Sequence, residues 1–116
     1  MNISKGGSLL LINKPKNWTS FDVVNKLRHL LKIKKIGHAG TLDPLAEGLL
    51  IIGIGKHTKK LAGLQGLNKT YEGVIEIGKT TPSFDLETPF NSASDYRSVT
   101  PKEIILAVET LTGELD

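Results

Sequence analysis

Two short apolar runs constrain the fold of this chain more than any other feature of its sequence. SLLLIN (Ser8–Asn13) and GLLIIGI (Gly48–Ile54) are each bounded by glycine or proline; the first predicts a buried strand and the second an interior strand. Between them, apolar residues recur at helical spacing in a segment that ends near Lys32. Thr19-Ser20 offers the N-cap of this helix, and Asp22 is placed to support its first turn. The predicted apolar face of this helix consists of Phe21, Val23, Val24, Leu27, Leu30 and Leu31.

The next part of the chain carries weaker signals. Thr58–Leu67 is a short, basic segment with the character of a helix. Thr70–Ile77 alternates apolar and polar residues and predicts a strand with one face in water. Gly78–Val99 is rich in Thr, Ser, Pro and Asp and predicts a long surface loop. We therefore expect an α+β fold with three strands, three helices and a mixed, largely antiparallel sheet that the helices flank.

The last predicted helix has the clearest boundaries. Thr100-Pro101-Lys102-Glu103 is a capping box with proline at the first helical position, and Gly113 is a C-terminal stop. The helix should run from Pro101 to about Leu111. Its predicted buried face consists of Ile104, Ile105, Val108 and Leu111.

Positive charge is concentrated in the first half of the chain. Residues 1–60 have a charge balance of +8 and residues 61–116 a balance of −5, which together give the net charge of +3. Five Lys or Arg fall within ten residues, Lys26–Lys35. Basic side chains gain affinity for polyanions by releasing condensed counterions, so this segment predicts a phosphate-facing surface. The alternative is a solvated basic surface in which one or two cations stabilise the helix end.

What the sequence lacks excludes several function classes. Cysteine is absent, which excludes disulfides and thiolate metal sites, and the three histidines have no metal-ligand spacing. The glycine-rich segment Gly53–Thr58 fits neither the P-loop nor the dinucleotide fingerprint. No apolar run approaches the ~20 residues that span a bilayer, and residues 1–7 lack the apolar core of a secretory signal. We expect a cytoplasmic protein without metal or membrane contact.

The segment Ile36–Leu45 (IGHAGTLDPL) has no periodicity and predicts a loop. Its glycines permit a tight backbone path, and Pro44 disfavours helical geometry at Asp43. A stiffly held carboxylate repels phosphate, so it suits a nucleophile or base better than a group that only binds RNA. One alternative makes Asp43 the N-cap of a helical turn over Leu45–Gly48. A weaker one pairs Asp43 with Glu47 as in a glycosidase.

The longer pattern around Asp43 favours the catalytic alternative. GHAGTLDPLAEGLL (Gly37–Leu50) resembles the signature of the TruB-type tRNA pseudouridine synthases and of their box H/ACA relatives, with a spacing of the bacterial style. Three further stretches are similar to family motifs in order and approximate spacing. They are Asn13-Lys14-Pro15 with Thr19-Ser20, then Lys69-Thr70-Tyr71, then Gly78 with Thr80, Thr81 and Asp85. The resemblance implies that residues 1–116 are the N-terminal portion of a catalytic domain with the pseudouridine synthase fold.

The resemblance also implies an activity and a set of site residues. The family isomerises the uridine at position 55 in the T loop of tRNA to pseudouridine, without cofactor or metal. Asp43 matches the essential aspartate, which either attacks the ribose or removes its C2′ proton. Tyr71 matches the tyrosine that stacks on the extruded base, and His38 the histidine that enters the T loop. Lys14, which would support the Tyr71 segment, and Lys69 complete the predicted substrate-binding set. The expected partner is the T arm of tRNA, bound by a monomer.

The resemblance also implies parts that these 116 residues do not supply. Family members have a longer catalytic domain, with an arginine that pairs with the catalytic aspartate, and then an RNA-binding domain. Arg97 is the only arginine in the second half of the chain, and it lies outside any matching motif. We therefore expect residues 1–116 alone to show little or no turnover. The alternative from another function class is a non-catalytic RNA-binding or tRNA-chaperone module, which would not need Asp43.

Overall fold

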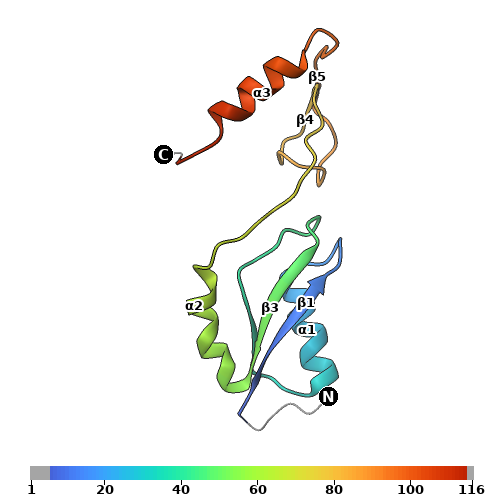
Figure 1. The fold of residues 1–116 in the computed structure, drawn as a ribbon. Coiled ribbons are helices and arrows are strands. Elements are labelled where there is room, and N and C mark those ends of the chain that lie inside the picture. The colour runs from blue at the N-terminus through green and yellow to red at the C-terminus, as the bar shows by residue number, and fades with distance from the viewer. Residues whose placement is uncertain (1–5, 115–116) are drawn as a thin grey trace. The chain divides into compact units, whose positions relative to one another are not determined.

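A computed structural model describes residues 6–114, which excludes part of the N-terminal segment tested above for a secretory signal. The chain divides into two compact units, Met1–Tyr71 and Glu72–Asp116 (Figure 1). Strands and helices occur in both, and every paired strand is antiparallel, so the predicted α+β class is confirmed.

The first unit is built on a three-stranded sheet. Its strands are β1 (Ser8–Lys14), β2 (Ile36–Ala39) and β3 (Gly48–Ile54), in the order β1-β3-β2. The two predicted strands are confirmed as β1, which is one residue longer, and β3, which is the interior strand of the sheet. The prediction that the first strand is buried is wrong, because β1 is an edge strand in this sheet and Leu9 (39%) and Leu11 (71%) are exposed. The prediction of a loop over the whole of Ile36–Leu45 is wrong for its first four residues. They form β2 because β3 offers them a partner: Ile36 is opposite Ile54 in the register and is buried.

Helix α1 (Ser20–Leu31) covers one face of this sheet. Thr19 caps it in a complete capping box with Asp22, and the hydrogen bonds from the Thr19 hydroxyl and then from its N–H lower the pKa of Asp22. The predicted helix end near Lys32 is confirmed, and Lys32 ends the helix in the left-handed conformation. The buried core consists of Val23, Val24, Ile36, Leu50, Ile52 and Ile54, with Leu27 and Leu31 packed against it.

Two residues of the predicted apolar face of α1 are not in the core. Phe21 is 57% exposed and Leu30 is 64% exposed, so only part of the predicted apolar face is buried. The sheet is only three strands wide, and it covers a narrower stripe of the helix than the sequence pattern offers. The ring of Phe21 instead lies 5.8 Å from the guanidinium of Arg28.

Two short helical segments follow β3. The 3-10 helix η1 (Gly55–Lys60) leads into α2 (Leu61–Gln65), so the single helix predicted over Thr58–Leu67 is confirmed only in part. A Cβ on Gly53 would lie 3.0 Å from Leu61 Cγ, and one on Gly37 would lie 3.3 Å from Leu61 Cδ1. Side chains alternate along a strand, so Gly53 faces away from its core neighbours Ile52 and Ile54. The two glycines therefore let α2 lie close against the face of the sheet opposite α1.

The second unit contains a small strand pair and one helix. β4 (Lys79–Thr80) pairs with β5 (Ser92–Ala93), so the loop predicted over Gly78–Val99 holds two short strands. The prediction of a strand over Thr70–Ile77 is wrong. Within residues 6–114 this segment has no strand partner, and alternation alone does not satisfy the hydrogen bonds of a sheet.

Helix α3 (Pro101–Thr110) confirms the predicted boundaries at the other end of the chain. Thr100 and Glu103 form the complete capping box, and the hydrogen bonds from Thr100, first from its N–H, lower the pKa of Glu103. The prediction of a buried face is wrong, because all four of the side chains assigned to it are exposed in the structure. They are Ile104, Ile105, Val108 and Leu111.

Candidate active site

The loop between β2 and β3, residues 40–47, carries Asp43. The side chain of Asp43 is exposed, and its carbonyl accepts a 3.0 Å hydrogen bond from Ala46 N–H, which closes a tight turn. No helical turn over Leu45–Gly48 appears in the described structure, so the alternative that Asp43 is a helix N-cap is wrong. Pro44 suits a turn as readily as the first position of a helix, which explains why the sequence left both open.

Lys14 holds the residue that follows Asp43. Its side chain is 0% exposed, and its ammonium donates to the carbonyls of Trp18 (2.6 Å), Pro15 (3.1 Å) and Pro44 (3.3 Å). The N–H of Asn17 donates to the same Pro44 carbonyl at 2.8 Å. The predicted support of the Tyr71 segment by Lys14 is therefore not what the structure shows. All three ammonium protons are used by carbonyls of the Pro15–Trp18 turn and of the Asp43 loop.

Ser20 holds the residue that precedes Asp43. Its hydroxyl accepts a 2.9 Å hydrogen bond from Leu42 N–H and donates to Leu42 C=O at 3.3 Å. Ser20 is 2% exposed, so both hydrogen bonds are shielded from water. The backbone is thus fixed on each side of Asp43, while its carboxylate extends to the surface.

Two glycines mark the ends of this loop. Gly40 has φ +82° where the chain leaves β2, and Gly48 has φ +121° where it enters β3. At Gly48 a Cβ would meet nothing within 4 Å, so the backbone conformation rather than space requires glycine there. Both glycines belong to the GHAGTLDPLAEGLL pattern, and the structure gives that part of the pattern a physical reason.

His38 lies in β2, two residues before the loop. Its Nδ1 is 2.5 Å from the carbonyl of Gly40, and a carbonyl can only accept, so Nδ1 carries the proton. In the neutral ring Nε2 is then an acceptor. The ring is half-buried, and His38 is opposite Ile52 in the register. Entry of His38 into a T loop stays a prediction.

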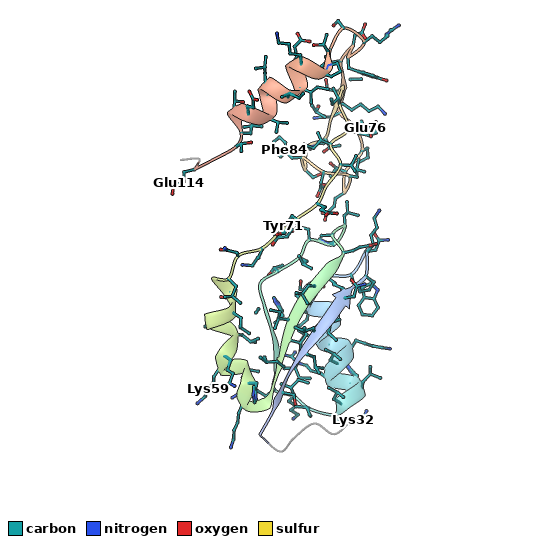
Figure 2. All side chains as sticks on the ribbon, viewed as in Figure 1. Lys32, Lys59, Tyr71, Glu76, Phe84 and Glu114 are labelled. Carbon is teal, nitrogen blue, oxygen red and sulfur yellow. The ribbon has the colours of Figure 1, made fainter. Side chains whose placement is uncertain are left out.

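Two cavities lie beside the loop on the sheet face opposite α1, with volumes of about 220 and 370 Å³. Both are lined by Leu42, the neighbour of Asp43, and by Tyr71, which Figure 2 labels. Asp43 itself is not among the lining residues of either cavity. The residues common to both cavities are Ala39, Leu42, Leu49, Lys69 and Tyr71.

Lys69 and Tyr71 differ in how firmly they are held. Lys69 donates to the carbonyls of Gln65 (2.6 Å) and Leu67 (3.0 Å), and so binds the C-terminal end of α2. Tyr71 is 68% exposed. The structure thus brings Tyr71 and Lys69 to the side of the Asp43 loop, with Tyr71 open to a ligand. Their roles in substrate binding stay predictions.

Positive charge gathers at the other end of the sheet. Gly55 N–H donates to Lys35 C=O at 2.8 Å, which joins the turn before β2 to the start of η1. Lys32 and Lys59 lie at this same end of the unit (Figure 2). We call this set of exposed lysines the lysine end; it consists of Lys32, Lys34, Lys35, Lys56, Lys59 and Lys60. Across the seven residues of β3, it lies ~20 Å from the Asp43 loop.

The structure changes which residues form the basic surface, whereas the contact with phosphate predicted over Lys26–Lys35 stays a prediction. Arg28 turns inward, where its guanidinium donates to Ile36 C=O at 3.0 Å and to Asn25 Oδ1 at 3.4 Å. The lysines of η1 take its place, and sequence reasoning missed that they converge with Lys32–Lys35. The only signal was the basic character of Thr58–Leu67, because the strand pairing that joins the two segments is not local.

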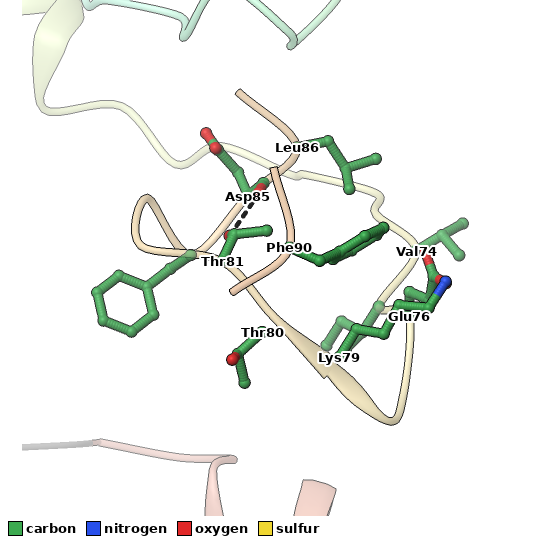
Figure 3. Close-up of a pocket in the computed structure, with 10 residues that line it drawn as sticks. Val74, Glu76, Lys79, Thr80, Thr81, Asp85, Leu86 and Phe90 are labelled. Atoms are coloured by element: carbon green, nitrogen blue, oxygen red, sulfur yellow. Dashed lines mark hydrogen bonds and ion pairs between the residues drawn. The ribbon is translucent and has the colours of Figure 1, made fainter. Parts of the chain in front are cut away.

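The second unit contains a cavity of about 260 Å³ around the Thr- and Asp-rich stretch (Figure 3). Thr81 donates to the backbone carbonyl of Asp85 at 2.6 Å, and the Lys79 ammonium lies 2.8 Å from Glu76 and 4.4 Å from the Phe90 ring centroid. Hydrogen bonds from Ser83 and then from the N–H of Glu87 lower the pKa of Asp85. The motif residues Thr81 and Asp85 are therefore tied together by local hydrogen bonds.

Two structural features are absent from the described part of the chain. Across residues 6–114, no three His, Asp or Glu side chains gather closely enough to hold a metal ion. None of the helices in this range has the length and apolar character that crossing a bilayer requires. The predictions that the protein uses no metal and no cofactor stay predictions.

Comparison with known proteins shows which family this chain belongs to. The model of the TruB family pseudouridylate synthase N-terminal domain matches residues 28–116. The chain is 50% identical to the tRNA pseudouridine synthase B of Flavobacterium johnsoniae, over 95% of this chain and 51% of that protein. It is 45% identical to the tRNA pseudouridine synthase B of Chlorobium chlorochromatii (92% and 44% covered) and 43% identical to that of Parabacteroides distasonis (94% and 49%).

The chain spans about half the length of these curated relatives. The matched residues include the whole Asp43 loop, the Lys69-to-Tyr71 segment and the Thr- and Asp-rich stretch. The family model and the relatives together cover both units of the structure. The resemblance drawn from the sequence motifs is confirmed, and this chain belongs to the TruB family of pseudouridylate synthases.

Proposed function

We propose that this chain supplies the catalytic aspartate, Asp43, of a tRNA pseudouridine synthase that isomerises the uridine at position 55 of the T loop. One observation carries the proposal: an exposed carboxylate extends from a loop whose flanking residues are both held by buried polar groups, in a chain of this family. Rigid placement is what a nucleophile or general base requires, since misplacement by ~1 Å can cost ~10²-fold in rate.

The reaction needs no redox partner, because substrate and product are isomers. The N1–C1′ glycosidic bond breaks, the uracil rotates, and C5 bonds to C1′, after which C5 loses its proton and N1 holds one. The Asp43 carboxylate either attacks C1′ and later leaves it, or removes the C2′ proton and returns it. A carboxylate is an acceptor only, so both routes use it in its charged form.

Tyr71 and the two cavities beside the loop could receive a nucleobase that has flipped out of the RNA base stack. Flipping a base costs a few kcal/mol, and stacking on an aromatic ring regains ~1–3 kcal/mol. The exposed Tyr71 ring offers such a surface at the rim of both cavities. The larger cavity, about 370 Å³, falls within the ~300–1,000 Å³ of small-molecule sites. We propose that Tyr71 stacks on the uracil and that Lys69 and His38 contact the surrounding T loop.

The lysine end supports RNA as the partner. Six exposed lysines about 20 Å from Asp43 would contact backbone phosphates of the T arm while the loop reaches the target nucleotide. Each phosphate contact makes the slope of log K against log[salt] more negative by ~0.9, where K is the association constant for the RNA. We propose that the protein binds the T arm as a monomer in the cytoplasm, without cofactor or metal.

A single assay tests the proposal on the full-length protein that contains this chain. The protein is incubated with a T-arm hairpin, and pseudouridine is mapped by carbodiimide labelling and reverse-transcription stops. We expect one stop, at the T-loop uridine, which Asp43→Asn abolishes while hairpin binding is kept. Asp95→Asn is the matched control, because Asp95 is an exposed aspartate outside the site, and it should keep the stop.

Two other results would change the proposal. Tight hairpin binding without a stop would favour the non-catalytic RNA-binding module. Loss of hairpin binding together with the stop in Asp43→Asn would make Asp43 structural. Residues 1–116 alone should bind the hairpin more weakly and give little or no stop, because the partner arginine implied by the family resemblance has no match among them.

A further inference from the structure

We infer that Ser20 is a positioning residue for Asp43: its hydroxyl sets the backbone of the preceding residue, Leu42, and thereby the direction of the carboxylate. The inference rests on the proposed function, because it assigns Ser20 a part in that reaction. Ser20 belongs to α1, and 22 residues separate it from Leu42, so the contact depends on the tertiary fold.

One hydroxyl satisfies both backbone groups of Leu42. It accepts from Leu42 N–H at 2.9 Å and donates to Leu42 C=O at 3.3 Å. Serine is suited to this position because a hydroxyl both donates and accepts from one atom on a short side chain. Alanine would leave two backbone groups without these hydrogen bonds in a place where Ser20 is only 2% exposed.

The hydroxyl of Ser20 is not needed to begin α1. The N-terminus of that helix is capped by Thr19 and Asp22, whose side chains satisfy each other and the backbone N–H groups. Ser20 directs its hydroxyl to the Asp43 loop instead. Thr19 and Asp22 therefore cap the helix, and Ser20 holds the loop. Substitutions at Asp22 and at Ser20 can test these two roles separately.

The other side of Asp43 is already fixed by Lys14 and by Asn17 N–H, which both donate to Pro44 C=O. With Ser20 present, the backbone before and after Asp43 is held at two points. Without the Ser20 hydroxyl, the Pro44 side keeps its hydrogen bonds, whereas Leu42 is held only by the packing of its side chain against the core. Leu42 then loses both of its hydrogen bonds to Ser20, and the peptide between Leu42 and Asp43 can rotate. Rotation of this peptide moves the carboxylate but leaves the lysine end unchanged.

The test compares Ser20→Ala with Asp22→Ala in the full-length protein. Asp22→Ala weakens the same helix start through the capping box but keeps the Ser20–Leu42 hydrogen bonds. Single-turnover rates and hairpin affinity are measured at a temperature at which both variants are folded. We expect Ser20→Ala to lower the rate by ~10–100-fold with hairpin affinity within about threefold. Asp22→Ala should lower the rate less than threefold.

Equal rates for the two variants would overturn the inference, since the effect would then follow from helix stability. Ser20→Thr keeps the hydroxyl and should recover most of the rate. If Ser20→Ala does not fold, Ser20→Cys decides instead: its weaker hydrogen bonds should give an intermediate rate, and a wild-type rate would overturn the inference.

Failure of the inference is distinguishable from failure of the proposed function. An inactive wild-type protein, or an active Asp43→Asn variant, contradicts the proposed function. An active wild type with an inactive Asp43→Asn and a nearly unaffected Ser20→Ala contradicts only the positioning role of Ser20.

Discussion

Replacement of Lys14 by methionine tests how the buried ammonium holds the Asp43 loop. Methionine keeps much of the apolar length of the side chain and removes the three donors to Pro15, Trp18 and Pro44. We expect Lys14→Met to destabilise the first unit, because carbonyls that the ammonium satisfies lose a charged donor.

The expected change in the free energy of unfolding of Lys14→Met follows from two opposing effects. A hydrogen bond from a charged donor contributes ~1.5–3 kcal/mol, so three would contribute ~5–9 kcal/mol. Burial of an ammonium costs several kcal/mol, which the variant no longer incurs. The Pro44 carbonyl keeps Asn17 N–H as a donor, and the hydrogen bonds to the Pro15 and Trp18 carbonyls are only partly buried, so water can replace part of what the ammonium supplies. The expected net loss is therefore ~2–4 kcal/mol.

Urea unfolding followed by tryptophan fluorescence measures this loss. Trp18 is the only tryptophan in the chain, and its own carbonyl is a partner of Lys14, so the signal reports the affected turn. With a slope of ~2 kcal/mol per M, the urea midpoint should fall by ~1–2 M. Lys16→Met, an exposed lysine two residues away, should change stability by less than ~0.5 kcal/mol. If Lys14→Met is as stable as Lys16→Met, charge burial cancels the hydrogen bonds and the reasoning is refuted.

Two further predictions concern the glycines and the helix caps. Gly53→Ala should destabilise the first unit by ~1–3 kcal/mol, because its Cβ would lie 3.0 Å from Leu61 and from the carbonyl of His57. Gly63→Ala, in α2 with open space around it, should stabilise the unit by ~0.5–1 kcal/mol in the same urea assay, and equal effects would refute the packing argument. Hydrogen bonds from Thr19 hold the pKa of Asp22 below the usual 3.8, so their contribution to stability is complete above that value and is lost as the pH falls through the lower folded pKa. Asp22→Asn should therefore reduce the dependence of the unfolding midpoint on pH below about pH 4, and an unchanged dependence would contradict this.

The sequence alone determined the features that depend on neighbouring residues. Both capping boxes, Thr19 with Asp22 and Thr100 with Glu103, lie within four consecutive residues and appear in the structure as predicted. The strands β1 and β3 were predicted because each is a continuous apolar run of strand length, although the sequence did not show that one face of β1 is exposed. The motif around Asp43 resembles the family signature, and this resemblance was sufficient to indicate the family. Its glycines have a local physical reason, since Gly40 and Gly48 both have positive φ.

Only the tertiary structure decided the features that need a distant partner. Ile36–Ala39 is a strand because β3 lies beside it, whereas Thr70–Ile77 has the pattern of a strand but no such partner within residues 6–114. The contacts of Lys14 with Pro44 and of Ser20 with Leu42 join segments 30 and 22 residues apart. Local propensity acts over a few residues, whereas hydrogen bonds between distant segments form only when the whole core brings them together. The sequence therefore identified Asp43, and the fold showed which buried side chains hold it.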